Sequence, residues 1–148
     1  MSAAIDVNLL LYASDTSSEF SQHAQEFLAE RAANSELIYV SWGTIMAYLR
    51  IATHPSIFGY PLSLAEASAN VNALLDLPQV RPLREEEGFW ELFQEITQIV
   101  AARGNLIPDV HLATILRQHG VNVLYTNDSD FRKFPFLDVR NPFEGERG

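Results

Sequence analysis

Short β-prone runs alternate with longer segments whose apolar residues recur at helical intervals, and this alternation leaves few architectures open to the chain. The β-prone runs lie near the N-terminus and at residues 37–41, 80–83, 121–125 and 137–139. The helical segments lie between them, at residues 9–13, 16–33, 42–53, 63–77, 84–103 and 108–120. Strands that alternate with helices build a mostly parallel sheet with helices over both faces. The sequence therefore predicts a fold of the α/β class.

Local signals set some of the boundaries. Thr16 with Glu19, and Ser63 with Glu66, have the spacing of a capping box, in which a hydroxyl and a carboxylate pair with backbone amides at a helix start. These pairs predict helices that begin there and run to about residues 33 and 77. Residues 141–148 read as a polar C-terminal tail, so we expect one domain at residues 1–140.

The charge balance and the lack of cysteine narrow the function classes. Ten basic and 19 acidic residues give a net charge of −9, and such a field repels phosphates, which disfavours a nonspecific polyanion binder. A nuclease is compatible with this charge if cations neutralise a local group of acids. The absence of cysteine excludes disulfides and thiolate metal sites. No apolar run approaches the roughly 18 residues that span a bilayer, and no signal-peptide pattern is present, so we expect a cytoplasmic protein without a membrane partner.

One carboxylate, Asp6, lies in the apolar run at residues 3–13, where a valine or isoleucine would be the default. A carboxylate among apolar neighbours is costly unless a cation or hydrogen-bond donors meet it. Because the sequence from residue 9 onward predicts a helix, Asp6 is expected at the carboxyl end of the first strand. The alternative is a structural acid that caps the following turn.

Two further acids, Asp109 and Asp128, lie at element boundaries far along the chain. Ligands of parallel sheets bind beyond the carboxyl ends of the strands, where Asp6 and Asp128 are expected and where the helix of Asp109 begins. Magnesium and manganese take oxygen ligands of this kind. A cation there could polarise a phosphodiester, generate hydroxide at neutral pH and stabilise the leaving oxygen, which indicates phosphodiester hydrolysis. Helix capping by aspartates is the alternative.

Four segments together resemble a known family. The sequences DVN at residues 6–8, LRIATHP at 49–55, DVHLA at 109–113 and TNDSDF at 126–131 resemble those of PIN-domain ribonucleases, and more narrowly of the VapC-type toxins of bacterial toxin–antitoxin pairs. The resemblance covers nearly the whole chain in the right order. It implies a three-layer α/β/α PIN-like fold and magnesium- or manganese-dependent cleavage of RNA.

The resemblance also implies roles for individual acids. Asp6 and Asp109 correspond to metal ligands of the family. Asp128 is the expected further acid, and Asp130 is the competing choice in the same motif. All four are therefore candidate catalytic residues.

Other polar residues have supporting roles under this resemblance. Asn8 would orient Asp6, and Thr126 would fix the strand end around the acids. Arg50 could face the site and meet RNA phosphates, or be an ordinary surface arginine. His111 is expected to pack or hydrogen-bond rather than to act as a general base.

The chain departs from the family at Ala47. The family carries a glutamate three residues before the arginine that corresponds to Arg50. The absence of this glutamate has three explanations: a natural subgroup that lacks the acid, an engineered substitution, or an inactive relative. One of the glutamates at residues 85–87 could replace the missing carboxylate. We predict that Ala47→Glu raises the affinity for metal.

The resemblance implies a homodimer and a cognate antitoxin, whose arginine would neutralise the acids by charge-assisted hydrogen bonds. Two other functions stay open. A catalytically weakened or dead PIN-like module would bind RNA or a protein without cleavage. A receiver-like phosphoacceptor domain would need an early acidic pair and a late lysine, but Asp6 stands alone in the first strand and Lys133, the sole lysine, falls in an expected loop.

Overall fold

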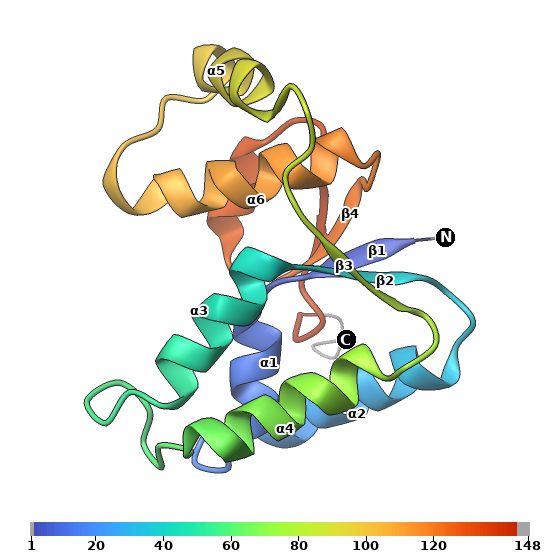
Figure 1. Ribbon diagram of the computed structural model, residues 1–148, viewed down its shortest axis with the longest axis vertical. Helices are drawn as coiled ribbons and strands as arrows, with labels where there is room; N and C mark the ends of the chain where they lie inside the picture. Colours follow the sequence, from blue (N-terminus) through green and yellow to red (C-terminus); the bar gives the residue numbers. More distant parts are fainter. Residues whose placement is uncertain (1, 145–148) are drawn as a thin grey trace.

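The centre of the molecule is a parallel sheet of five strands, and the computed structural model describes residues 2–144 around it (Figure 1). The strand order is β3-β2-β1-β4-β5, and all neighbouring strands run parallel. The strands are β1 (Ala3–Ile5), β2 (Ile38–Ser41), β3 (Val80–Leu83), β4 (Val123–Tyr125) and β5 (Asp138–Arg140). From β1 the chain adds β2 and β3 on one side and then β4 and β5 on the other, so the direction of strand order reverses between β1 and β4. Ligands of parallel sheets bind at such a reversal, beyond the carboxyl ends of the strands.

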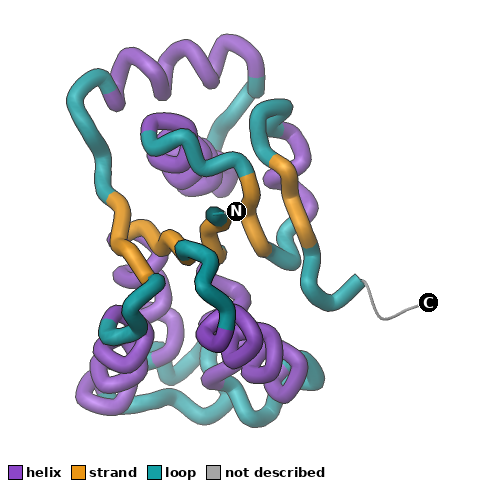
Figure 2. The backbone as a smooth tube through the Cα atoms, turned by 90° about the vertical axis from the view of Figure 1, so that its right-hand side faces the viewer, coloured by secondary structure: helices purple, strands orange, loops and turns teal. Residues whose placement is uncertain are grey.

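Helices cover both faces of this sheet (Figures 1 and 2). One layer consists of α1 (Val7–Ser14), α2 (Ser21–Ala33), α3 (Trp42–Ala52) and α4 (Leu64–Leu75). The other contains α5 (Phe89–Ile99) and α6 (Ile107–Gln118). Two short 3₁₀ helices, η1 (Gly104–Leu106) and η2 (Ser129–Lys133), complete the described elements. The predicted three-layer α/β/α fold with a parallel sheet is confirmed.

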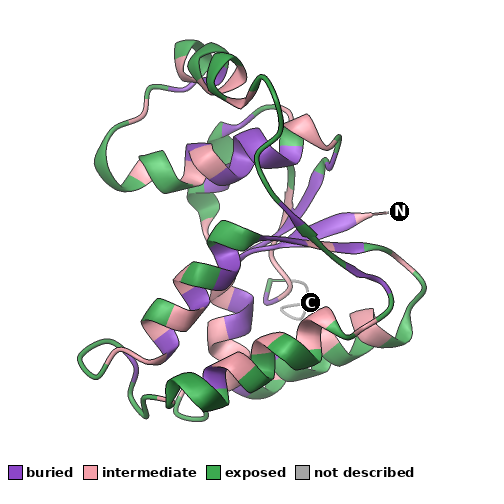
Figure 3. Cartoon of the chain, viewed as in Figure 1, coloured by how far each residue is buried: buried purple, intermediate pink, exposed green. Residues whose placement is uncertain are grey.

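The central strands β1 and β4 are buried along their whole length, and their side chains alternate between two cores, whereas the edge strands β3 and β5 carry exposed residues (Figure 3). Ala3 and Ile5 pack into the core beneath α1 to α4, whereas Ala4 between them packs into the core beneath α5 and α6. Leu124 of β4 likewise belongs to the second core. Successive residues of a strand point to opposite faces, so a strand covered on both sides reads as a continuous apolar run.

The two capping-box predictions have different outcomes. Ser63 and Glu66 form the predicted box at the start of α4: the Ser63 hydroxyl accepts from the Glu66 amide, and the Glu66 carboxylate accepts from the Ser63 amide. The box predicted at Thr16 is wrong. α2 begins only at Ser21, because the preceding residues form turns in which Asp15 accepts from the amide and hydroxyl of Ser17.

The helix predicted at residues 84–103 is shorter, because α5 begins after Gly88, whose φ of 86° lies in the left-handed region. Residues 84–88 instead form a loop against α6. The Gln118 side chain accepts from the Glu86 amide and donates to the carbonyl oxygens of Glu86 and Glu87. Pairing with α6 therefore replaces the expected first turns of the helix.

Part of the predicted polar tail packs onto the domain. Phe143 is buried, and its ring lies against those of Tyr12, Phe20 and His23 at centroid distances of 5.6, 4.8 and 4.9 Å. Residues 145–148 of the predicted tail lie outside the described residues. None of the helices in residues 2–144 is long and apolar enough to cross a membrane.

Candidate functional site

Asp6 directly follows β1 and is held by two donors. Its Oδ1 accepts from the Val7 amide at 2.7 Å, and its Oδ2 accepts from the Thr126 hydroxyl at 2.8 Å. The residue is 8% exposed, and burial raises the pKa of its carboxyl despite these hydrogen bonds. Asp6 therefore lies at the strand end as predicted, and it also caps α1.

Thr126, directly after β4, connects several predicted residues. Its hydroxyl donates to Asp6 and accepts from the Asn8 side-chain amide at 3.1 Å and from the Asp128 backbone amide at 3.0 Å. Asn8 thus reaches Asp6 through Thr126. Because Thr126 is buried, its hydroxyl ties the ends of β1 and β4 together.

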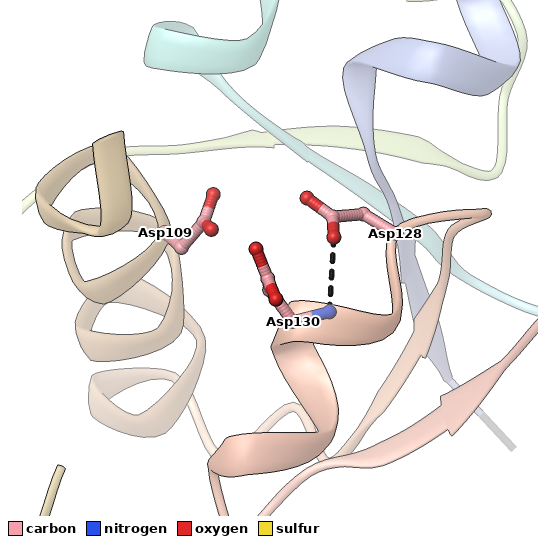
Figure 4. Close-up of side chains that lie close together, drawn as sticks. All are labelled: Asp109, Asp128 and Asp130. Carbon is pink, nitrogen blue, oxygen red and sulfur yellow. Dashed lines mark hydrogen bonds between the residues drawn. The ribbon is translucent and has the colours of Figure 1, made fainter.

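Asp109, Asp128 and Asp130 meet in front of this strand edge (Figure 4). Asp109 lies in the first turn of α6, and Asp128 precedes η2 and accepts from the Asp130 amide at 2.9 Å. One carboxylate oxygen from each of the three acids lies within 4.8 Å of the others. The structure therefore brings together both of the acids that the sequence offered as alternatives.

The four acids act on one another electrostatically. The pKa of Asp109 is raised to about 7, first by burial and then by the negative charges of Asp128, Asp6 and Asp130. The positive charge of Lys133, whose Nζ lies 3.6 Å from Asp130, offsets only part of this rise in the pKa of Asp109. Clustered carboxylates that repel one another fit a hard divalent cation with oxygen ligands. The three carboxylates of Asp109, Asp128 and Asp130 could therefore hold a divalent metal ion.

A cavity of about 150 Å³ adjoins two of these acids. Asp6 and Asp109 line it from two sides, and Ala47 of α3 lines it where the family resemblance places a glutamate. Ser41 and Thr44 also line it, and their hydroxyls bond at 2.9 Å. Sequence reasoning did not single out these two hydroxyl residues, although Ser41 lies between a predicted strand and a predicted helix.

The remaining candidates lie farther out. Arg50 is exposed on α3 and does not line the cavity. Glu85 and Glu86 do not line it either, and their carboxylates face His111 and His119 respectively. The structure therefore brings Asp6, Asp109, Asp128, Asp130, Asn8 and Thr126 together but leaves Arg50 apart.

A family model and curated relatives match nearly the whole chain. The family model described as PIN domain matches residues 3–137. Ribonuclease VapC48 of Mycobacterium tuberculosis is 37% identical over 145 residues, which cover 98% of this chain and 100% of the relative. Ribonuclease VapC43 of the same organism is 33% identical over 144 residues, or 96% of each chain.

Solved structures share the fold at low sequence identity. VapC20 of Mycobacterium tuberculosis, described as a Sarcin-Ricin loop cleaving toxin, superposes with a TM-score of 0.69 at 16% identity over 94% of this chain and 99% of its own. VapBC2 of Rickettsia felis, bound to a promoter DNA fragment, gives a TM-score of 0.69 at 15% identity over 95% and 98%.

Proposed function

This chain belongs to the PIN-domain family, and on that premise we propose that it is a VapC-type endoribonuclease toxin that cleaves RNA with a divalent cation. The convergence of Asp109, Asp128 and Asp130 beside Asp6 carries the proposal. These acids come from three separate segments of the sequence, yet their negative charges lie close enough to raise the pKa of Asp109. Such an arrangement is costly without a cation, which favours a binding site over a set of separate helix caps.

Asp109 and Asp128, with Asp6 or Asp130, would hold magnesium or manganese. The chemistry supplied by such a bound ion is polarisation of the phosphodiester and a lowered pKa of bound water. Thr126 keeps Asp6 and the Asp128 backbone in register through its single hydroxyl. Asn8 restrains Thr126 in turn, so both polar residues position the acids instead of touching the RNA.

Ala47 supports a second candidate, a PIN-like module that binds RNA or a protein with weakened or no cleavage. Ala47 lines the cavity beside Asp6 and Asp109, at the position where the family has a further carboxylate. None of the three glutamates at residues 85–87 lines the cavity to replace it. The receiver-like alternative is less supported, because the acids are distributed as in the PIN family.

We infer two protein partners from the relatives. Solved neighbours include VapBC assemblies, among them VapBC-1 of nontypeable Haemophilus influenzae. An antitoxin segment with an arginine would neutralise the acids of this chain. A homodimer would cover large apolar side chains that are exposed on α3 and α5, namely Trp42, Met46, Trp90 and Ile99. The domain boundary at residue 140 and the cytoplasmic location stay predictions.

The test is cleavage of a total RNA pool, with mapping of the cut ends. We expect defined cuts with magnesium or manganese, none with EDTA, and none with Asp6→Asn. Tight RNA binding without cuts would instead favour the module that does not cleave. Phosphorylation at Asp6 would favour the receiver-like domain.

A further inference from the structure

Asn127 lies between Thr126 and Asp128, and it has no role in the metal site proposed above. These residues belong to the loop after β4 that carries Asp128 and Asp130 into the acidic cluster (Figure 4). The Thr126 hydroxyl holds this loop to Asp6 and to the Asp128 amide. The Asn127 side chain instead bonds to α1 and to a residue that follows β5.

A closed series of contacts joins Asn127 to α1 and to residues 141–143, the C-terminal segment. Asn127 Nδ2 donates to the Tyr12 hydroxyl oxygen at 3.2 Å, and Asn141 Nδ2 donates to Asn127 Oδ1 at 2.7 Å. The backbone amide of Phe143 donates to Asn141 Oδ1 at 2.9 Å. The Phe143 ring then packs edge-on to the Tyr12 ring, with 5.6 Å between the ring centroids.

The direction of these hydrogen bonds follows from the backbone donor. A backbone amide only donates, so Asn141 must turn its Oδ1 to Phe143 and its Nδ2 to Asn127. Asn127 must therefore accept with its Oδ1, which leaves its Nδ2 to donate to Tyr12. Neither side-chain amide titrates, so the arrangement does not depend on a protonation state.

The C-terminal segment is itself fixed to the domain next to the loop. Phe143 is buried, and its ring also packs against Phe20 and His23 of the first helical layer. The Arg140 carbonyl, directly before the segment, accepts from the Thr126 amide at 3.0 Å. A small cavity is lined both by loop residues 126–129 and by Asn141. The segment is therefore a supported neighbour of the loop.

Contacts that hold a metal ligand in place raise its affinity for the ion, because less freedom is lost on binding. Resting on the proposed function, we propose that the C-terminal segment positions the metal site, by holding the loop of Asp128 and Asp130 through the Asn127 side chain. Asn127 and Asn141 are positioning residues that contact neither metal nor RNA. The Thr126 hydroxyl and the Asn127 amide then restrain the loop at two successive residues.

Titration of the full chain with manganese, followed by isothermal titration calorimetry, tests this role. Asn127→Ala and Asn141→Ala should each raise the dissociation constant about fivefold, less than the 10–100-fold effect of a direct partner of a metal ligand. The double variant should also bind about fivefold more weakly than the wild type. Two independent contacts would instead multiply to about 25-fold.

Asn70→Ala is the matched control. Asn70 Nδ2 donates to Tyr48 Oη at 3.0 Å, and neither residue lines the acidic cavity. The control thus removes the same kind of side chain and a hydrogen bond, so it should lower stability without changing the dissociation constant for manganese. Circular dichroism melting checks that each variant is folded at the temperature of the titration.

Amide hydrogen exchange of the metal-free chain, followed by NMR, is a second readout that needs no metal. Asn141→Ala should speed exchange of the Asp128 and Asp130 amides at least about threefold, because the loop opens more often. Asn70→Ala should leave both exchange rates unchanged.

Wild-type affinity for manganese in both single variants would overturn the inference. A double variant about 25-fold weaker than the wild type would also overturn it, as would an equal loss in Asn70→Ala or unchanged amide exchange in Asn141→Ala. A wild-type chain that binds no manganese would contradict the proposed function instead. The exchange rates alone would then decide whether the C-terminal segment holds the loop.

Discussion

Two cavities of the molecule treat polar groups in opposite ways. The larger cavity, about 270 Å³, lies among α1 to α4 and is lined mainly by apolar side chains. The polar side chains in its lining hydrogen-bond to one another: Tyr48 Oη lies 2.7 Å from Ser14 Oγ and 3.0 Å from Asn70 Nδ2. The smaller cavity adjoins Asp6 and Asp109, whose negative charges repel each other. Satisfied polar groups stabilise a fold, whereas like charges held close together, as those of Asp6 and Asp109 are, indicate a site for a ligand.

The largest expected effect is at Asp109. Asp109→Asn removes one carboxylate from the cluster and should lower metal-dependent RNA cleavage by roughly a hundredfold or more, since losing an indirect partner of a metal ligand already costs 10–100-fold. Gel assays of RNA cleavage at saturating magnesium or manganese measure the rate. If Asp109→Asn cleaves RNA at the wild-type rate, the acidic cavity has no catalytic role, and the proposed difference in function between the two cavities is contradicted.

Ala47→Glu sharpens the same distinction. A carboxylate at a residue that lines the acidic cavity should strengthen binding of manganese about tenfold, an increment of about 1.4 kcal/mol. Isothermal titration calorimetry measures the dissociation constant. Ile51→Glu on the same helix but outside the cavity lining is the matched control, and a gain equal to that of Ala47→Glu would contradict the alignment.

Thr126→Val tests the connection between the strand ends. The change leaves Asp6 Oδ2 without its donor, and the Asn8 and Asp128 amides without their acceptor. We expect a loss of about 1–3 kcal/mol in unfolding free energy. Urea denaturation measures this loss, and cleavage should fall as the acids lose register. Unchanged stability and activity would show that the hydroxyl does not position them.

The pH dependence of stability is expected to come partly from Asp109. Its pKa rises from 3.8 to about 7 on folding, so the folded state binds this proton more tightly than the unfolded state. The stability that protonation contributes is complete below about pH 4 and is lost as the pH rises through 7. Without metal, the melting temperature should therefore fall between pH 5 and pH 8, by roughly 2–4 °C more in the wild type than in Asp109→Asn. Equal falls would contradict the raised pKa.

The smallest effect is expected in the apolar cavity. Tyr48→Phe removes the hydroxyl that joins Ser14 and Asn70, at a cost of about 1 kcal/mol in unfolding free energy. RNA cleavage should not change, because Tyr48 does not line the acidic cavity. Thermal melting and the gel assay together measure both results. A loss of cleavage without a loss of stability would mean that the two cavities are coupled.

Much of the fold could be predicted from the sequence because its signals are local. Periodic apolar residues predicted the alternation of strands and helices, and even β3 with Pro82 was confirmed, as an edge strand where the missing amide is tolerated. The wrong start of α2 has a local cause as well. Asp15 competes for the donors of Ser17, so the capping signal at Thr16 was outweighed by a turn.

The site was predictable only as a set of residues. Asp6, Asp109 and Asp128 could be named because an acid at a strand end or helix start is visible in a single sequence. The sequence could not choose between Asp128 and Asp130, and the structure places both near Asp109. The pairing of His111 with Glu85 spans 26 residues and had no signal of its own.

The sequence by itself determined the class of the fold, the parallel sheet and the acidic residues available for a site, because backbone periodicity and chain order decide which side chains reach the strand ends. Only the tertiary structure decided that Thr126 joins three of the site residues, that Ala47 lines the acidic cavity and that Phe143 is buried. These features depend on packing between segments far apart in the chain, and local sequence patterns do not predict such contacts.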